Sequence, residues 1–128
     1  MTYKRKLEKD IRCPLEYGLD VFGGRWDSRV ICVLANKGTL RYSELRDEMA
    51  DITDAVMAST LKKLMGHGIV GRVQYNEMPL RVEYSLTERG LSAVPILQAI
   101  CKWSGMHRTE EINTTAPYCA GCDFNGDR

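Results

Sequence analysis

Residues 53–86 of this chain decide its fold, and they read TDAVMASTLKKLMGHGIVGRVQYNEMPLRVEYSL. Plotted at 100° per residue, the first part of this segment separates into two arcs. One arc is apolar and suits packing on a core. The other is small and polar, with lysines in its C-terminal half, and consists of Asp54, Ala55, Ala58, Ser59, Lys62 and Lys63. The pattern predicts an amphipathic helix over about 54–66 with Thr53 as its N-cap.

After residue 68 the sequence changes to a period of two, which is the period of a β-strand. Polar and apolar residues alternate before and after a five-residue stretch, 76–80, which contains Pro79. This stretch is longer than a tight turn and is expected to project from the body. We therefore expect a β-hairpin over about 70–86 in which one face is packed and carries Val73, Tyr75, Val82, Tyr84 and Leu86.

Helical spacing of apolar residues also occurs on both sides of this segment. Pro14 suits the first turn of one helix, Gly38 suits a positive φ at the end of another, and Ser43 suits an N-cap of a third. A minor strand is expected at about 39–42. The additional helices are predicted at about 14–22, 26–35, 44–50 and 88–110.

The last of these helices contains Pro95, at which we expect a kink or a restart. Its apolar side chains form a stripe that is expected to pack, and that stripe consists of Leu91, Val94, Leu97, Cys101 and Met106. The whole order of elements predicts an α+β fold that is mostly helical, namely a winged helix-turn-helix with additional N-terminal and C-terminal helices.

This order also predicts double-stranded DNA as a partner, because a helix enters the major groove only if its exposed face carries short side chains or side chains that reach base edges. Backbone N–H groups behind Thr53 suit a phosphate. Arg81 on the wing suits an adjacent minor groove. The alternative from pattern alone is an ordinary domain with one amphipathic helix and one hairpin.

Several short motifs make the chain resemble the HxlR family of winged-helix regulators, which is MarR-like. They are CPLE at 13–16, GGRW at 23–26, RYSELR at 41–46, LKKL at 61–64, GIV at 68–70 and PLRVEYSLT at 79–87. The resemblance covers about Cys13 to Trp103. It implies a homodimer built by the helices at 14–22 and 88–110, a recognition helix at 54–66 and a wing at 70–86.

The resemblance further implies a sequence-specific transcriptional regulator on a pseudo-palindromic operator, with half-sites about 34 Å or a small multiple apart. We expect three parts: a basic arm at 1–12, the winged-helix domain at 13–112, and a polar tail at 113–128. The expected DNA-binding residues are Thr53, Asp54, Ala55, Ala58, Ser59, Lys62, Lys63, Arg81 and Arg41.

Some positions depart from the pattern of the family. Its members usually carry Lys or Arg where this chain has Ala55, and Thr where it has Ala58. Asp54 places an acid near the groove, which repels phosphates but accepts a hydrogen bond from a cytosine amino group. The base preference of other members is therefore not carried over to this chain.

The cysteines suggest a redox function, and the alternative is that they are only packed or free thiols. Cys13 occupies the position where some members place a sensing thiol, and Lys9 and Arg12 near a helix start favour its thiolate. Cys101 is its candidate partner across the dimer. In the tail, Cys119 and Cys122 form a CxxC motif with only His107 nearby, which is fewer than the four ligands of a structural zinc site. A zinc site shared between two subunits is the alternative to a flexible tail with two free thiols.

Composition sets the remaining limits. The 128 residues carry a net charge of +1, although residues 1–12 hold five basic and two acidic side chains. No apolar run is long enough for a membrane span, and no secretory h-region follows the first residues, so we expect a cytoplasmic protein. No catalytic motif is evident, so we expect no enzyme and no cofactor. The alternative function is a winged-helix interaction or metal-binding module without selective DNA binding.

Overall fold

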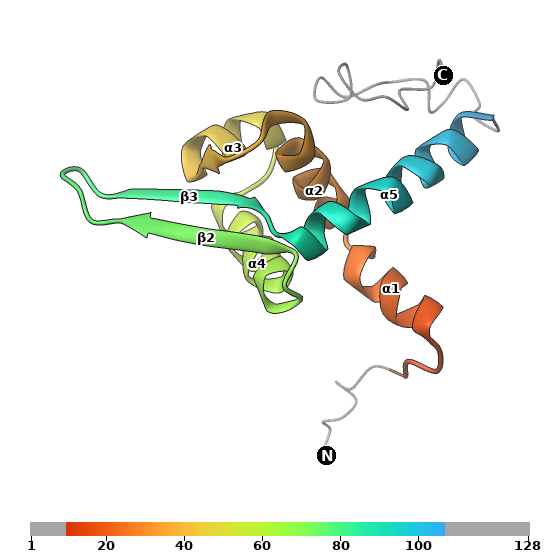
Figure 1. Cartoon of the computed structure of the whole chain (residues 1–128). Helices are drawn as coiled ribbons and strands as arrows, with labels where there is room; N and C mark the ends of the chain where they lie inside the picture. The colour runs from red at the N-terminus through yellow and green to blue at the C-terminus, as the bar shows by residue number, and fades with distance from the viewer. Residues whose placement is uncertain (1–9, 107–128) are drawn as a thin grey trace.

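The computed structural model describes residues 10–106 of the chain. It contains five helices and a small antiparallel sheet within that range (Figure 1). In chain order the elements are α1 (Pro14–Phe22), α2 (Arg25–Lys37), β1 (Leu40–Arg41), α3 (Tyr42–Met49), α4 (Asp54–Gly66), β2 (Val70–Tyr75), β3 (Arg81–Leu86) and α5 (Glu88–Met106). The predicted winged helix-turn-helix is therefore confirmed.

The helix ends follow local capping chemistry. Thr53 caps α4 as predicted, since its Oγ1 accepts a hydrogen bond from Val56 N at 3.2 Å. Gly38 has a φ of 83° at the end of α2. The prediction that Ser43 caps the third helix is wrong. Helix α3 begins directly after β1 because the side chain of Glu44 accepts the backbone N–H of Arg41 at 2.8 Å.

The sheet has the strand order β1-β3-β2, and both pairs are antiparallel. Its register corrects the predicted hairpin face. Tyr84 lies opposite Arg72, whereas Val73 lies opposite Glu83 and Tyr75 lies opposite Arg81. Residues opposite each other share a face, so Val73 and Tyr75 lie on the face away from Tyr84. Only the Tyr84 face packs at its base, where Tyr84 itself is buried.

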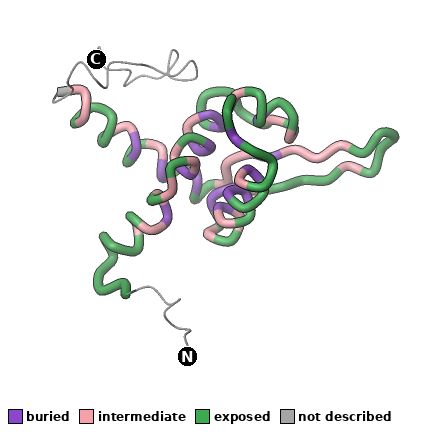
Figure 2. Tube along the Cα trace, turned by 180° about the vertical axis from the view of Figure 1, so that it is seen from behind, coloured by how far each residue is buried: buried purple, intermediate pink, exposed green. Residues whose placement is uncertain are grey.

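The hydrophobic core lies where α2, α3 and α4 meet the base of the sheet, as Figure 2 shows by the buried segments at the centre of the molecule. Its fully buried side chains include Val30, Val33, Leu45, Met57 and Leu64. The apolar arc of α4 therefore packs as predicted, because Met57, Leu61 and Leu64 are all buried.

The predicted stripe of α5 packs in part within one chain, because Leu97 is buried and Val94 packs against the core. Leu91 is 56% exposed, and Cys101 is also exposed. Among the residues of this helix whose burial is described, the buried ones are Gly90, Ala93 and Leu97, all in its first ten residues. The reason is geometric: the first half of α5 lies on the core, while its second half extends away from it (Figure 1). The helix continues through Pro95 without a break in its assignment.

A compact junction joins the wing to α5 at Thr87. The backbone N–H of Thr87 donates to Ile69 O at 3.0 Å, and its hydroxyl lies 2.5 Å from Gly68 O. The same hydroxyl accepts the N–H of Gly90 at 2.9 Å and so begins α5. Gly90 is required here because a Cβ would overlap the carbonyl oxygen of Ile69. The junction therefore holds three elements together at one point.

Within residues 10–106, none of the helices is both long and apolar enough to cross a membrane.

Candidate DNA-binding surface

The polar arc of α4 faces away from the core. The side chains of this helix that the sequence assigned to DNA and that are exposed are Asp54, Ala55, Ala58, Ser59 and Lys62. Thr53 is exposed as well, at the N-terminal end of the helix. The exposed side chains are therefore short in the first two turns of the helix, and Lys62 adds a positive charge beyond them. This arrangement suits close approach to base edges.

Lys63 differs from Lys62. Its ammonium Nζ lies 2.6 Å from Oδ2 of Asp27, and the Asp27 side chain is only 4% exposed. The same Oδ2 accepts the backbone N–H of Gly24 at 2.9 Å, which caps α2. Lys63 thus ties α4 to the start of α2. The sequence placed Lys63 on the polar arc, but the pair was not predicted because Asp27 was not singled out. Asp27 lies on the same helical face as the buried residues Val30, Ile31 and Leu34 of α2.

Asp54 also has a partner. Its Oδ1 lies 2.8 Å from Nε of Arg46 and 3.3 Å from the hydroxyl of Tyr42, both from α3. Burial raises the pKa of Tyr42 above its ordinary value, and the neighbouring Asp54 carboxylate raises it further. The acid at the start of α4 therefore joins the two helices of the helix-turn-helix, and Arg46 offsets its charge.

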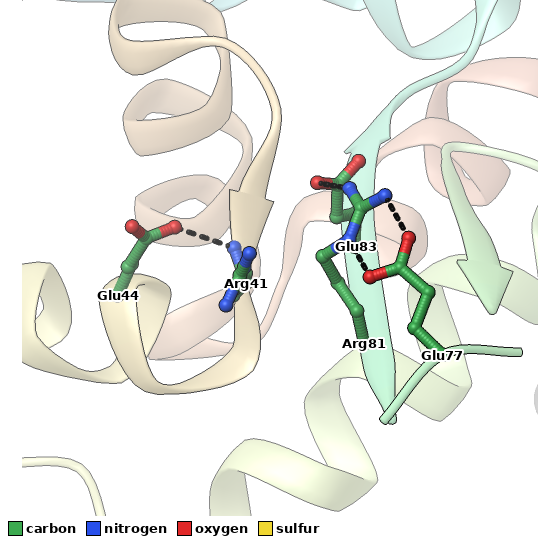
Figure 3. Close-up of polar contacts among 5 residues, drawn as sticks. All are labelled: Arg41, Glu44, Glu77, Arg81 and Glu83. Carbon is green, nitrogen blue, oxygen red and sulfur yellow. Dashed lines mark hydrogen bonds and ion pairs between the residues drawn. The ribbon is translucent and has the colours of Figure 1, made fainter. Parts of the chain in front are cut away.

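Arg81 is the centre of a charged cluster on the wing (Figure 3). Its Nη2 lies 2.6 Å from Glu77 Oε2, and its Nη1 lies 2.5 Å from Glu83 Oε2. The guanidinium also lies over the ring of Tyr75, at 3.8 Å from the ring centroid. Hydrogen bonding to Arg81 lowers the pKa of Glu77, and the same contacts raise the pKa of Arg81. The arginine assigned to the minor groove is thus ion-paired to two carboxylates.

Of two further arginines, one lies beside the wing and one within it. Arg41 in β1 lies opposite Glu83 in the sheet register, and Figure 3 shows it on the strand next to the Arg81 cluster. Arg72 in β2 is exposed and bonds the neutral amide oxygen of Gln74 at 3.3 Å. Arg72 was not predicted from the sequence to bind DNA. The available signal was its place on the polar face of the alternating strand, beside the neutral side chain of Gln74.

The thiols assigned to redox chemistry are both exposed. Cys13 is the N-cap residue of α1, as predicted, and its carbonyl accepts the N–H of Tyr17 at 3.2 Å. Its charged surroundings differ from the expectation, because Arg12 pairs with Asp10 at 2.8 Å. Cys101 lies on α5. The candidate zinc ligands Cys119, Cys122 and His107 lie outside the described residues, as do most of the basic arm and the polar tail.

Helix α1 contacts the end of the DNA-facing helix. The hydroxyl of Tyr17 lies 3.3 Å from Nδ1 of His67, and the two rings meet edge to face at 5.9 Å between centroids. His67 is the C-cap residue of α4. His67 therefore joins α1 to α4.

The free faces of α1 and α5 are strongly apolar. Both helices extend away from the body on the side opposite the wing (Figures 1 and 2). Their large exposed apolar side chains are Leu15, Tyr17, Leu19, Leu91, Ile96, Ile100 and Trp103. Apolar surface gathered on two neighbouring helices marks a site of association in soluble proteins.

Comparison with known sequences gives consistent matches. The sequence profile of the family described as HxlR-like helix-turn-helix matches residues 21–113. A relative from Methanothermobacter thermautotrophicus, described as an HTH-type transcriptional regulator, is 40% identical over 102 residues, which are 80% of this chain and 77% of the relative. The regulator YkvN of Bacillus subtilis, described in the same way, is 41% identical over 103 residues, which are 80% of this chain and 86% of its own.

Solved structures share the fold at similar identity. The HTH-type transcriptional regulator ytcD has a TM-score of 0.71 at 34% identity, covering 75% of this chain and 97% of its own. The reduced form of the transcriptional regulator YodB from Bacillus subtilis has a TM-score of 0.69 at 31% identity, covering 75% and 94%. The redox regulator HypR in its oxidised form has a TM-score of 0.64 at 37% identity, covering 76% and 99%.

Proposed function

Since the chain belongs to the family of HxlR-like helix-turn-helix transcriptional regulators, we propose that it binds double-stranded DNA sequence-specifically as a homodimer. The observation that carries this proposal is the exposed face of α4, where Ala55, Ala58 and Ser59 leave room for base edges and Lys62 supplies charge. A buried ion pair at Lys63 and a capped start at Thr53 hold that helix in place.

The apolar faces of α1 and α5 support the homodimer. Leu15 is 68% exposed and Trp103 is 61% exposed, and a second copy would remove both from water. A two-fold axis through these helices would place two α4 helices and two wings on one side of the dimer. The corresponding operator is a pseudo-palindrome with half-sites about one helical turn, or a small multiple of it, apart.

We further propose that DNA binding responds to oxidation at Cys13. The thiol is exposed at the start of α1, and two of the similar structures are named for reduced or oxidised regulators. With hypochlorite as the oxidant, the Cys13 thiol and a second thiol form one disulfide, while hypochlorite takes their two electrons and two protons and becomes chloride and water. Cys101 of the partner subunit is the proposed second thiol.

Selection of bound sequences from a random duplex pool tests the proposal, with the protein reduced and then treated with hypochlorite. We expect one enriched palindromic motif, and we expect Ser59→Ala to change its base preference. Lys62→Ala should weaken binding to all sequences. Absence of a selective complex at moderate salt under both conditions would contradict DNA recognition. Equal responses of the wild type and Cys13→Ser would contradict thiol sensing alone.

A further inference from the structure

The tip of the wing is apolar and open to solvent. Met78 is 97% exposed and Leu80 is 58% exposed, on either side of Pro79. The wing as a whole, residues 70–86, carries two arginines and two glutamates, so its formal charges cancel. A neutral wing with an apolar end differs from a wing that holds DNA by free cations.

The charge on Arg81 is not available to a phosphate. Its Nε, Nη1 and Nη2 atoms all contact carboxylate oxygens of Glu77 and Glu83, at 2.5–3.3 Å. Its side chain is only 23% exposed and lies over the ring of Tyr75. Arg41, whose charge also lowers the pKa of Glu77, offsets the second carboxylate, so the cluster as a whole is close to neutral. The Arg81 cluster therefore closes the base of the loop and stiffens the wing.

The direction of the wing decides which partner its tip can meet. Strand β2 packs against α4, so the wing leaves the body beside the DNA-facing helix. It extends away from α1 and α5 in both views (Figures 1 and 2), so a dimer through those helices leaves the tips free. A strand of six residues spans about 20 Å, which is enough to cross one phosphate backbone into the neighbouring minor groove, about 6 Å wide.

On the basis of the proposed function, we propose that the wing binds the minor groove with Met78 and Leu80, while Arg81 acts as a positioning residue. Apolar side chains that enter the minor groove wedge between base pairs and bend the duplex. Pyrimidine–purine steps bend most easily, so the wing selects such a step where it touches DNA. Arg72, whose described contact is with the neutral amide oxygen of Gln74, supplies the phosphate contact of the wing.

The test uses the full-length protein and the duplex enriched by selection, labelled at both ends for energy transfer. Met78→Ser combined with Leu80→Ser removes the apolar tip. Val73→Ser is the matched control, because Val73 is 49% exposed on the shaft of the same wing. Arg72→Gln and Arg81→Gln compare the two arginines through the salt dependence of binding. Both tip residues are exposed, so the double variant keeps the fold, which thermal unfolding checks.

We expect the double variant to lose about tenfold or more in affinity and to bend the duplex less, whereas Val73→Ser behaves as the wild type. Arg72→Gln should reduce the salt slope by about 0.9, the value of one phosphate contact, and Arg81→Gln should leave the slope unchanged. A double variant that binds and bends DNA as the wild type does would overturn the inference. So would an Arg81→Gln variant whose slope falls by one contact. If the wild type itself selects no sequence, the proposed function fails together with it.

Discussion

An ion pair separates the roles of two neighbouring lysines in α4. Lys62 and Lys63 are neighbours with the same side chain, yet one is exposed and the other reaches a buried carboxylate at 2.6 Å. A helical plot puts both near the polar arc, because it counts only positions along one helix. The partner Asp27 lies 36 residues earlier, so no local pattern could predict the pair.

These two lysines give a matched experiment. Lys63→Met leaves a buried carboxylate without its cation and should lower the free energy of unfolding by about 1.5–3 kcal/mol. Lys62→Met should change it by less than about 0.5 kcal/mol but should lower the salt slope of DNA binding. Urea unfolding and binding titrations at several salt concentrations measure both effects. Equal stabilities of the two variants would contradict the structural assignment of Lys63.

The ion pair of Arg81 with Glu77 has a consequence for the pH dependence of stability. Arg81 lowers the pKa of Glu77 below its usual value, so the folded carboxylate binds its proton less readily than the unfolded one. The stabilising contact is therefore complete above the ordinary carboxyl range and is lost only as the pH falls through the lowered value. A carboxyl NMR titration should show this low midpoint, and in Arg81→Gln the midpoint should rise toward the ordinary value.

At the scale of elements, periodicity predicted the helices and the hairpin but not how the two strands meet. Alternation assigns the faces within one strand, whereas the pairing of Tyr75 with Arg81 decides which faces coincide. That register depends on the conformation of the loop at 76–80, which cannot be predicted from the alternation of polar and apolar residues in the strands. Similarly, the apolar stripe on α5 was visible in the sequence, but periodicity alone could not show that Leu97 would reach the core while Leu91 stays exposed.

Gly90 of α5 packs closely against the carbonyl of Ile69, the residue before β2, so the addition of one methyl group tests this contact. Gly90→Ala would overlap the Ile69 carbonyl and should destabilise the protein by about 1–3 kcal/mol. Gly66→Ala is the control, because a Cβ there meets open space and should stabilise α4 by about 0.5–1 kcal/mol. Thermal unfolding compares them. A neutral Gly90→Ala would show that the junction gives way more easily than its geometry implies.

At the scale of the whole molecule, the apolar faces of α1 and α5 predict the assembly. Ile96→Ser combined with Ile100→Ser should convert the proposed dimer to a monomer in sedimentation equilibrium, because both side chains are about half exposed in one chain. Val73→Ser, at 49% exposure against 48% for Ile100, should leave the mass unchanged. If the double variant remains dimeric, the interface does not lie on this face of α5.

The Thr87 junction has a mechanical consequence. One hydroxyl is bonded to the turn after α4, to the start of the wing and to the first turn of α5, so these parts cannot rotate independently. Helix α5 has 19 residues and is about 28 Å long. We therefore expect a tilt of α5 to be passed to the wing and to the end of α4 through the hydrogen bonds of Thr87.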